Sequence, residues 1–137
     1  MTKKQTTAPF GMHLMLDAYG ADVDKLNDMK LVFKFLNDLP ELIGMTKLSA
    51  PSVLDCDATK TGKDPGGISG FVIIAESHVS IHTFAKRAFF TMDLYSCNNF
   101  EDKINKVLEY TKKTFGFTKR ELNIVTRGKE YPTKNVV

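Results

Sequence analysis

The stretch GISGFVIIAESHVSIHTF, Gly67 to Phe84, holds the pattern that decides how this chain is interpreted. Its apolar run, 71–75, is short and continuous, as expected for a buried strand. The run stops at Glu76-Ser77-His78, and a second histidine follows at His82. A carboxylate, a hydroxyl and two imidazoles therefore interrupt a core strand. Polar groups at such a position need a structural or a chemical explanation.

Periodicity on both sides of this stretch predicts further strands and two helices. Apolar residues alternate from Met12 to Ala18, which indicates a strand and places His13 and Asp17 on one face. Helical spacing indicates a first helix over 29–43, capped by Asn27 or Asp28 and ended by Gly44. It indicates a second helix over 104–115, capped by Asn99 and Asp102 and ended by Gly116. We expect the other strands at 47–57, 68–76, 78–84, 88–97 and 118–127, with a polar loop at 57–67.

This order, β-α-β-β-β-β-α-β, predicts an α+β fold with a single antiparallel-rich sheet and two helices packed on one face. The strand holding Phe89, Phe90 and Met92 is apolar on both sides. Since helices cover only one face, we expect the chain to dimerise through the other face of the sheet.

Length and composition favour a single domain over residues 1–137, with a flexible N-terminus, 1–10, and a flexible tail, 128–137. The net charge is +3, from 19 basic and 16 acidic residues. No run of Lys and Arg is interleaved with aromatic residues, so nucleic-acid binding is not expected. The apolar runs are far shorter than the ~20 residues of a membrane span, so no membrane association is expected either.

The N-terminus and the cysteines indicate a cytoplasmic location. MTKKQTTAPF has two lysines but no apolar region after them, as a signal peptide would require. Cys56 and Cys97 are too few for a disulfide framework. We expect both to be reduced thiols.

Three common chemistries do not fit the polar cluster. A serine hydrolase needs Gly-x-Ser-x-Gly, which GISGF at 67–71 does not provide. His78 and His82 lie about 13 Å apart along a strand, too far to share a zinc ion, so no metal is expected. The loop before Gly67 lacks the spacing of a phosphate-binding P-loop.

Self-cleavage does fit a serine that directly follows a carbonyl group at a strand end. The Ser77 hydroxyl can attack the Glu76 carbonyl and convert the peptide to an ester. Removal of the Ser77 α-proton then eliminates the ester and, with release of ammonia, leaves a pyruvoyl group. Such a ketone forms a Schiff base with a substrate amine and stabilises the carbanion left by loss of CO₂.

With GMHLMLDAYG before it and DLYSC after it, this stretch resembles the prokaryotic S-adenosylmethionine decarboxylase proenzymes, from about Gly11 to Arg127. The most specific part is Glu-Ser-His at 76–78, with His82 five residues after Ser77 and Cys97 twenty residues after it. Ser69, eight residues before Ser77, stands where the family has its processing serine.

The resemblance implies cleavage between Glu76 and Ser77, into fragments 1–76 and 77–137, with the pyruvoyl group from Ser77 as the cofactor. Ser69 and His82 would assist processing, His82 in the elimination step. Cys97 would be the acid that reprotonates the decarboxylated carbon, a role that suits a thiol with an ordinary pKa of about 8.5.

The resemblance also implies a homodimer with shared active sites. Five residues of a strand separate Ser77 from His82 by roughly 16 Å. We therefore expect His82 to act on the Ser77 of a second subunit. The expected substrate is a small molecule with a free α-amino acid group, used in polyamine and spermidine biosynthesis.

Two positions depart from the family where it recognises the nucleoside. Many members have a glutamate for the ribose hydroxyls where this chain has Lys86, which can only donate hydrogen bonds. The loop KDPGG, 63–67, lacks the aromatic residue that stacks on adenine. Asp17, near an acidic position of the family, and Lys86 are candidate substrate-binding residues. S-adenosylmethionine is the expected substrate; the alternatives are a pyruvoyl-dependent arginine or ornithine decarboxylase and an unprocessed regulatory homologue.

Overall fold

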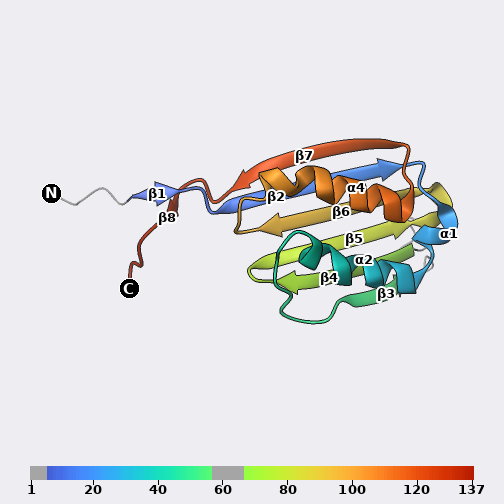
Figure 1. The fold of residues 1–137 in the computed structure, drawn as a ribbon, viewed down its shortest axis with the longest axis horizontal. Helices are drawn as coiled ribbons and strands as arrows, with labels where there is room; N and C mark the ends of the chain where they lie inside the picture. The colour runs from blue at the N-terminus through green and yellow to red at the C-terminus, as the bar shows by residue number, and fades with distance from the viewer. Residues whose placement is uncertain (1–5, 57–66) are drawn as a thin grey trace.

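Six antiparallel strands form one sheet in the computed structural model, which describes residues 6–56 and 67–137 (Figure 1). They are β2 (Gly11–Tyr19), β3 (Ser52–Cys56), β4 (Gly67–Ile74), β5 (Ser77–Phe84), β6 (Phe89–Ser96) and β7 (Lys119–Arg127). Their order across the sheet is β3-β4-β5-β6-β2-β7. The first strand of the sheet therefore pairs with the two that lie nearest the C-terminus, β6 and β7.

Two long helices, α2 (Met29–Leu42) and α4 (Ile104–Phe115), lie side by side across the sheet (Figure 1). The Asp28 side chain caps α2 by accepting a hydrogen bond of 3.1 Å from the Leu31 amide. Gly116 ends α4 with a φ of +71°, a left-handed conformation that glycine adopts without strain. These two helices are where the apolar periodicity predicted them.

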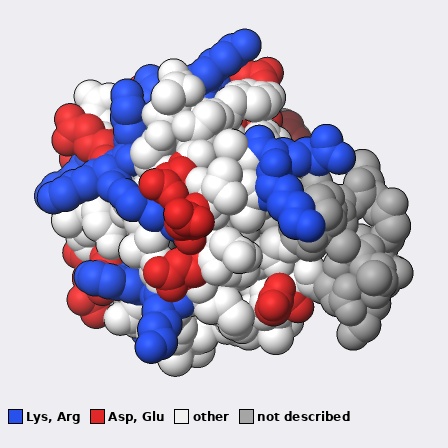
Figure 2. Space-filling model, turned by 90° about the vertical axis from the view of Figure 1, so that its right-hand side faces the viewer, with Lys and Arg blue, Asp and Glu red and all other residues white. Residues whose placement is uncertain are grey.

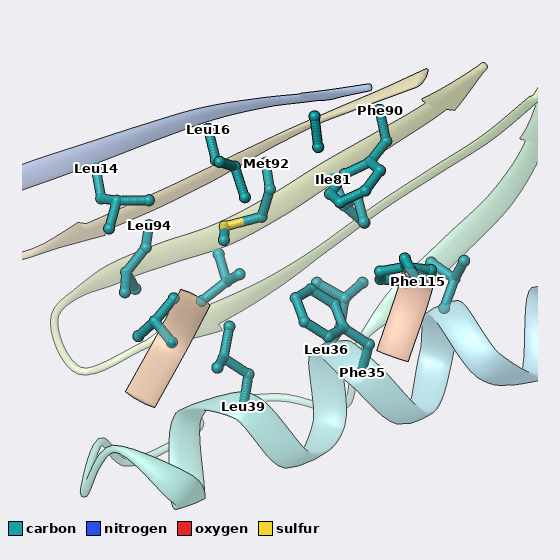
Figure 3. Close-up of a cluster of buried hydrophobic side chains, with 14 of the residues drawn as sticks. Leu14, Leu16, Phe35, Leu36, Leu39, Ile81, Phe90, Met92, Leu94 and Phe115 are labelled. Atoms are coloured by element: carbon teal, nitrogen blue, oxygen red, sulfur yellow. The ribbon is translucent and has the colours of Figure 1, made fainter. Parts of the chain in front are cut away.

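The core lies between these helices and one face of the sheet (Figure 3). Alternate residues of each strand point toward the helices, because successive side chains of a strand point to opposite faces. Phe115 of α4 is fully buried and contacts the rings of Phe35 of α2 and Phe90 of β6, with centroids 5.1 and 5.2 Å away. The sheet contributes Leu14, Leu16, Ile81, Met92 and Leu94 to the same cluster.

The other face of the sheet, which we call the open face, carries no helix in the described ranges (Figure 1). The strand register places mostly polar and half-exposed side chains on it. Its members include His13, Asp17, Ser69, Phe71, Ile73, His78, His82, Asp93, Tyr95, Glu121 and Arg127. The predicted α+β fold with helices on one face of an antiparallel sheet is confirmed.

Several boundaries differ from the sequence-based prediction. The strand predicted at 47–57 begins only at Ser52, after Pro51; Lys47 makes a single isolated bridge with Ile74. Asp102 does not cap α4, because a 3₁₀ turn, η2 (Glu101–Lys103), precedes the helix and the Lys103 cap position makes no side-chain hydrogen bond. A short helix, α1 (Val23–Leu26), and a 3₁₀ turn, η1 (Ala85–Arg87), were not predicted. Most of the predicted polar loop, 57–66, lies outside the described residues.

The described residues nearest the two ends of the chain extend from the same end of the sheet (Figure 1). There, β1 (Thr7–Ala8) pairs antiparallel with β8 (Tyr131–Pro132), and the Phe10 and Tyr131 rings lie 4.9 Å apart. These residues fall within the two segments predicted to be flexible; their mobility stays a prediction. Among the described residues, no helix is long and apolar enough to cross a membrane.

Replacement of Phe115 by alanine should destabilise the fold by about 3–5 kcal/mol, because the ring fills the space between both helices and the sheet. Urea denaturation followed by circular dichroism measures this free energy. Phe33→Ala is the matched control, since that ring is 40% exposed on α2 and should cost less than about 0.5 kcal/mol. Equal losses in both variants would contradict the position assigned to Phe115.

Candidate active site

The Glu76–Ser77 bond lies at the end of the sheet, where two residues connect β4 to β5. Ser77 is the first residue of β5 and faces Ile74 on one side and Ser96 on the other. Its φ is +142°, a conformation that L-residues with a side chain rarely adopt. A backbone of this kind costs on the order of 1–3 kcal/mol and is found mainly at functional sites.

The Glu76 carbonyl oxygen accepts a hydrogen bond of 3.3 Å from the backbone N–H of Cys97. Cys97 directly follows β6, the neighbour of β5 in the sheet. A donor at this oxygen withdraws electrons from the carbonyl carbon and stabilises negative charge on the oxygen during nucleophilic attack. The bond that precedes Ser77 is therefore polarised by the residue predicted to be the acid.

Gly11 allows β2 to approach the chain at Cys97. A Cβ atom at Gly11 would lie 2.0 Å from the Ser96 oxygen and 2.8 Å from the Cys97 Cα, closer than these atoms can come. Any side chain there would move the Ser96–Cys97 segment. Gly11 therefore keeps the Cys97 amide in position against Glu76.

A second group of polar residues lies on the open face. Ser69 of β4 and His82 of β5 are directly opposite in the register, and the Ser69 Oγ lies 2.8 Å from the His82 Nδ1. The Cys56 Sγ lies 3.2 Å from the same Ser69 oxygen. The structure thus joins the two predicted processing residues, and it adds Cys56, which the sequence analysis treated only as a reduced thiol.

The structure does not bring these two groups together within one chain. Ser77 and His82 occupy opposite parts of β5, five residues and roughly 16 Å apart. Ser69 is equally distant, because it faces His82. Cys97 lies at the Ser77 end, beyond the last residue of β6.

A network that the sequence analysis missed lies on the open face, near the Ser77 end of the sheet. The Asp93 carboxylate is 3.0 Å from the His13 Nε2, and an Arg127 Nη1 is 3.2 Å from the His13 Nδ1. The Arg127 guanidinium also lies over the Tyr95 ring, 4.5 Å from its centroid. The His78 ring is 5.7 Å from Tyr95 and 6.5 Å from His13, so four strands contribute to one cluster.

The hydrogen bonds of this network define the form of His13. A guanidinium can only donate, so the His13 Nδ1 that faces Arg127 has to accept. The proton of the neutral ring then lies on Nε2, which donates to Asp93. In the sequence, the alternation of apolar residues from Met12 to Ala18 indicated only that His13 would share a face with Asp17.

The two candidate substrate-binding residues lie away from Ser77 in the same chain. Asp17 of β2 faces Thr91 and Glu121, at the same level of the sheet as His82. Lys86 is exposed in η1, which follows β5 at the end of the sheet opposite to Ser77. Figure 2 looks at this opposite end, where basic and acidic side chains are interspersed.

Two concave regions adjoin the Ser77 end. A cavity of about 340 Å³ reaches Cys97 and is also lined by Gly11, Asn99, Glu101 and Thr126, among others. A wider and more open depression of about 1060 Å³ is lined by residues that include Phe10, Tyr95, Arg127 and Tyr131. The smaller cavity has the size of a small-molecule site. Among the described residues, no group of three or more His, Cys, Asp and Glu side chains is arranged to hold a metal ion.

Comparisons with known proteins identify the family of the chain. Residues 12–128 match the protein family described as S-adenosylmethionine decarboxylase. The chain belongs to this family. It is 32% identical to the S-adenosylmethionine decarboxylase proenzyme of Clostridium botulinum (strain Loch Maree / Type A3) over 120 residues, which cover 87% of this chain and 95% of the relative.

Two further members of the family resemble the chain over nearly its whole length. The S-adenosylmethionine decarboxylase proenzyme of Anoxybacillus flavithermus is 31% identical over 118 residues, which are 86% of this chain and 87% of that protein. The crystal structure of the adenosylmethionine decarboxylase from Aquifex aeolicus superposes with a TM-score of 0.76 at 25% identity, and covers 93% of this chain and 98% of its own. The S-adenosylmethionine decarboxylase match includes both groups of polar residues, those around Ser77 and those around His82.

His78 should titrate below the ordinary histidine pKa. Burial is the main cause of its lowered pKa, and His13 and Arg127 lower it further against the opposing effect of Asp93. Because unfolding restores a pKa near 6.5, the unfolded chain takes up a proton first as the pH falls. His78 therefore makes stability decrease as the pH drops through about 6.5.

A pH titration of the His78 ring protons by NMR measures this shift in the folded protein, with the urea-unfolded chain as reference. The His78→Asn variant should show a flatter dependence of the unfolding free energy on pH between about 5 and 7. A folded His78 that titrates at or above the unfolded value would show that burial does not govern its charge.

Proposed function

We propose that this chain is a pyruvoyl-dependent S-adenosylmethionine decarboxylase that cleaves itself between Glu76 and Ser77. One observation carries the proposal: Ser77 holds a rarely adopted backbone conformation directly beside a carbonyl group that the Cys97 amide polarises. The enzyme would belong to polyamine biosynthesis, as its family does.

Self-cleavage begins when the Ser77 Oγ attacks the Glu76 carbonyl carbon. The new C–O bond forms as the C–N bond to Ser77 breaks, which gives an ester and a free amine. The Cys97 N–H stabilises the charge on the Glu76 oxygen during this step. The strain at Ser77 is relieved when its backbone nitrogen is released, which favours the ester.

A base then removes the Ser77 α-proton. The ester bond to the Ser77 Oγ breaks, the main-chain carboxylate of Glu76 leaves, and a double bond forms between the Cα and Cβ atoms of residue 77. Water converts the resulting enamine nitrogen to ammonia and leaves a pyruvoyl group at the start of the fragment 77–137. His82 is the proposed base. Ser69 holds its Nδ1 through the bond of 2.8 Å, and Cys56 in turn holds the Ser69 hydroxyl.

The residues around Ser77 fit a pyruvoyl group. At this position the ketone would be linked by an amide bond to His78, the next residue. The Cys97 segment would lie along one side of it. The pyruvoyl group supplies an electron sink for the carbanion formed when an α-amino acid loses CO₂. Cys97 lines a cavity of about 340 Å³ at the same end of the sheet, and its thiol is the proposed proton donor to a bound substrate.

His82 and Ser69 would act across a homodimer, because roughly 16 Å of strand separates them from Ser77 in one chain. Each active site would then combine Ser77 and Cys97 of one protomer with Ser69 and His82 of its partner. Asp17 and Lys86, which lie near the His82 part of the sheet, are the proposed substrate-binding residues of that partner.

S-adenosylmethionine is the proposed substrate although the loop before Gly67 has no aromatic residue. Three rings border the depression at the Ser77 end instead: Phe10, Tyr95 and Tyr131. Phe10 lies 4.9 Å from Tyr131 and 6.4 Å from Tyr95. Aromatic faces of this kind stack on nucleobases and attract cations such as a sulfonium.

Replacement of Ser77 by alanine should abolish both cleavage and decarboxylation, because the attacking hydroxyl and the precursor of the ketone are lost together. A denaturing gel with intact-mass measurement follows cleavage into fragments 1–76 and 77–137, and release of ¹⁴CO₂ from carboxyl-labelled substrate follows decarboxylation. Ser80→Ala, on the same strand, is the matched control and should be cleaved normally. Decarboxylation by an intact Ser77→Ala chain would rule out the mechanism.

The substrate is tested with cleaved wild-type protein and carboxyl-labelled S-adenosylmethionine, arginine and ornithine in parallel. We expect ¹⁴CO₂ from S-adenosylmethionine alone. Release only from arginine or ornithine would replace the proposed substrate but keep the chemistry. A wild-type chain that stays whole and releases no CO₂ would support the regulatory alternative.

Cys97→Ala should still be cleaved, because the Glu76 carbonyl is held by a backbone amide that the substitution keeps. Turnover should fall by about 10²–10⁴-fold, as expected for loss of a general acid. Asn105→Ala, exposed on α4 and away from both groups of polar residues, is the control and should be cleaved and turn over normally. Normal turnover of Cys97→Ala would remove Cys97 from the mechanism.

A further inference from the structure

Three polar side chains contact one another in series on the open face, across the strands β3, β4 and β5. The Cys56 Sγ lies 3.2 Å from the Ser69 Oγ, and the same oxygen lies 2.8 Å from the His82 Nδ1. The proposed self-cleavage uses Ser69 and His82, whereas the thiol has no part in it beyond its contact with Ser69. The direction of the two hydrogen bonds, however, decides which nitrogen of His82 is free to act as a base.

The strand register places the Cys56 thiol beside Ser69. Cys56, the last residue of β3, faces Gly67 on β4. Ser69, two residues further along β4, is therefore its diagonal neighbour on the same face of the sheet. A Cβ atom at Gly67 would lie 1.8 Å from the Thr83 carbonyl oxygen, so no side chain fits at that position. The position opposite Cys56 thus holds no side chain, and the thiol contacts the Ser69 hydroxyl instead.

The Ser69 hydroxyl has one proton and can donate it to only one of its two neighbours. If it donates to the His82 Nδ1, the neutral ring carries its own proton on Nε2. Nε2 then has no lone pair with which to take up a proton. If Ser69 donates to the Cys56 Sγ instead, Nδ1 can carry the ring proton and donate it to the Ser69 oxygen. Nε2 is then free to act as the base.

The proposed reaction requires the second of these arrangements. Ser69 occupies Nδ1, so Nε2 is the nitrogen that the exposed His82 side chain can offer to a reacting group. Both contacts are hydrogen bonds in either arrangement, so the balance between them depends on the group at position 56. An acceptor at this position favours the second arrangement, whereas an apolar group leaves the Ser69 proton to His82 and blocks the base.

We propose that Cys56 is a positioning residue for self-cleavage. By accepting the hydrogen bond of the Ser69 hydroxyl, it keeps the ring proton of His82 on Nδ1. Nε2 is then free to remove the Ser77 α-proton. This inference rests on the proposed function, which makes His82 the base. Since the attack of the Ser77 hydroxyl does not use this base, Cys56 affects the elimination and not the formation of the ester.

Two substitutions at position 56 separate hydrogen bonding from packing. Cys56→Ser keeps an acceptor, whereas Cys56→Val keeps an apolar side chain suited to a strand and cannot accept. Both are made in Ser77→Ala chains, which lack the attacking hydroxyl, and the ¹⁵N shifts of the His82 ring are measured above the ordinary histidine pKa of about 6.5. Loss of the signal in His82→Asn assigns it among the three histidines. We expect the ring proton on Nδ1 in the parent and in Cys56→Ser, and on Nε2 in Cys56→Val.

Two further chains test whether Ser69 transmits the effect. When Ser69→Ala is added, Cys56→Ser and Cys56→Val should give the same His82 ¹⁵N shifts, because the group at position 56 acts only through the hydroxyl. A difference that persists without the hydroxyl would show that position 56 acts on His82 by packing, and it would overturn the proposal. Identical ¹⁵N shifts in Cys56→Ser and Cys56→Val with the Ser69 hydroxyl present would overturn it as well.

In chains that keep Ser77, Cys56→Val should slow formation of the pyruvoyl fragment by about tenfold or more, since complete loss of a general base costs about 10²–10⁴-fold. The ester should accumulate. Hydroxylamine attacks its carbonyl carbon and breaks the C–O bond, which leaves a hydroxamate on fragment 1–76 and a serine at the start of fragment 77–137. Intact mass distinguishes this serine from the lighter pyruvoyl group. Cys56→Ser should form the pyruvoyl fragment at close to the wild-type rate.

Failure of this inference and failure of the proposed function are distinguishable. If wild type and Cys56→Val form the pyruvoyl fragment equally fast, the positioning role of Cys56 is overturned. If Cys56→Val forms no ester that hydroxylamine can cut, Cys56 acts on the first step, and its assignment to the elimination is overturned. If wild type itself stays whole, the proposed function fails, and the ¹⁵N shifts still decide whether Cys56 determines which nitrogen of His82 carries the proton.

Discussion

The geometry of a single β-strand constrains everything else in this protein. Ser77 and His82 are five residues apart on β5, and an extended strand keeps them roughly 16 Å apart whatever their side chains do. The neighbouring strands hold this strand in place on both sides, through Ile74 and Ser96. The proposed chemistry uses both residues and would therefore need two chains. The described helices cover one face of the sheet and leave the other face accessible to a second chain.

The reactive junction depends on contacts that bring distant parts of the sequence together. Glu76 stands at the connection between β4 and β5, but its carbonyl is polarised by Cys97 from beyond β6. That position depends in turn on Gly11 at the start of β2, where a side chain would collide with Cys97. Three segments thus define the surroundings of one peptide bond. The three lie at the ends of different strands, so a change in the register of any of these strands would alter the surroundings of that bond.

Local signals in the sequence were sufficient to predict the two long helices and the inner strands. They were insufficient to predict features that depend on tertiary contacts. The apolar periodicity, with Gly116 as a stop, placed the second helix at 104–115, because amphipathic spacing and a left-handed glycine are local properties. Asp102 was wrong as a cap, because the chain makes a 3₁₀ turn before entering α4. The expected processing role of Ser69 and His82 came from the family resemblance, whereas their contact with each other was not predicted from the sequence. The cluster of His13, Asp93 and Arg127 joins residues 80 and 114 positions apart, and only the register of three strands could reveal it.

The strand order gives the two proposed fragments an unusual relation. Fragment 1–76 supplies β2, β3 and β4, and fragment 77–137 supplies β5, β6 and β7. In the sheet, β2 lies between β6 and β7, and β4 lies beside β5. The fragments are therefore interwoven, and they cannot separate without breaking the hydrogen bonds on both sides of β2 as well as those between β4 and β5. A cut between Glu76 and Ser77 would change the covalent structure of the molecule and leave its sheet whole.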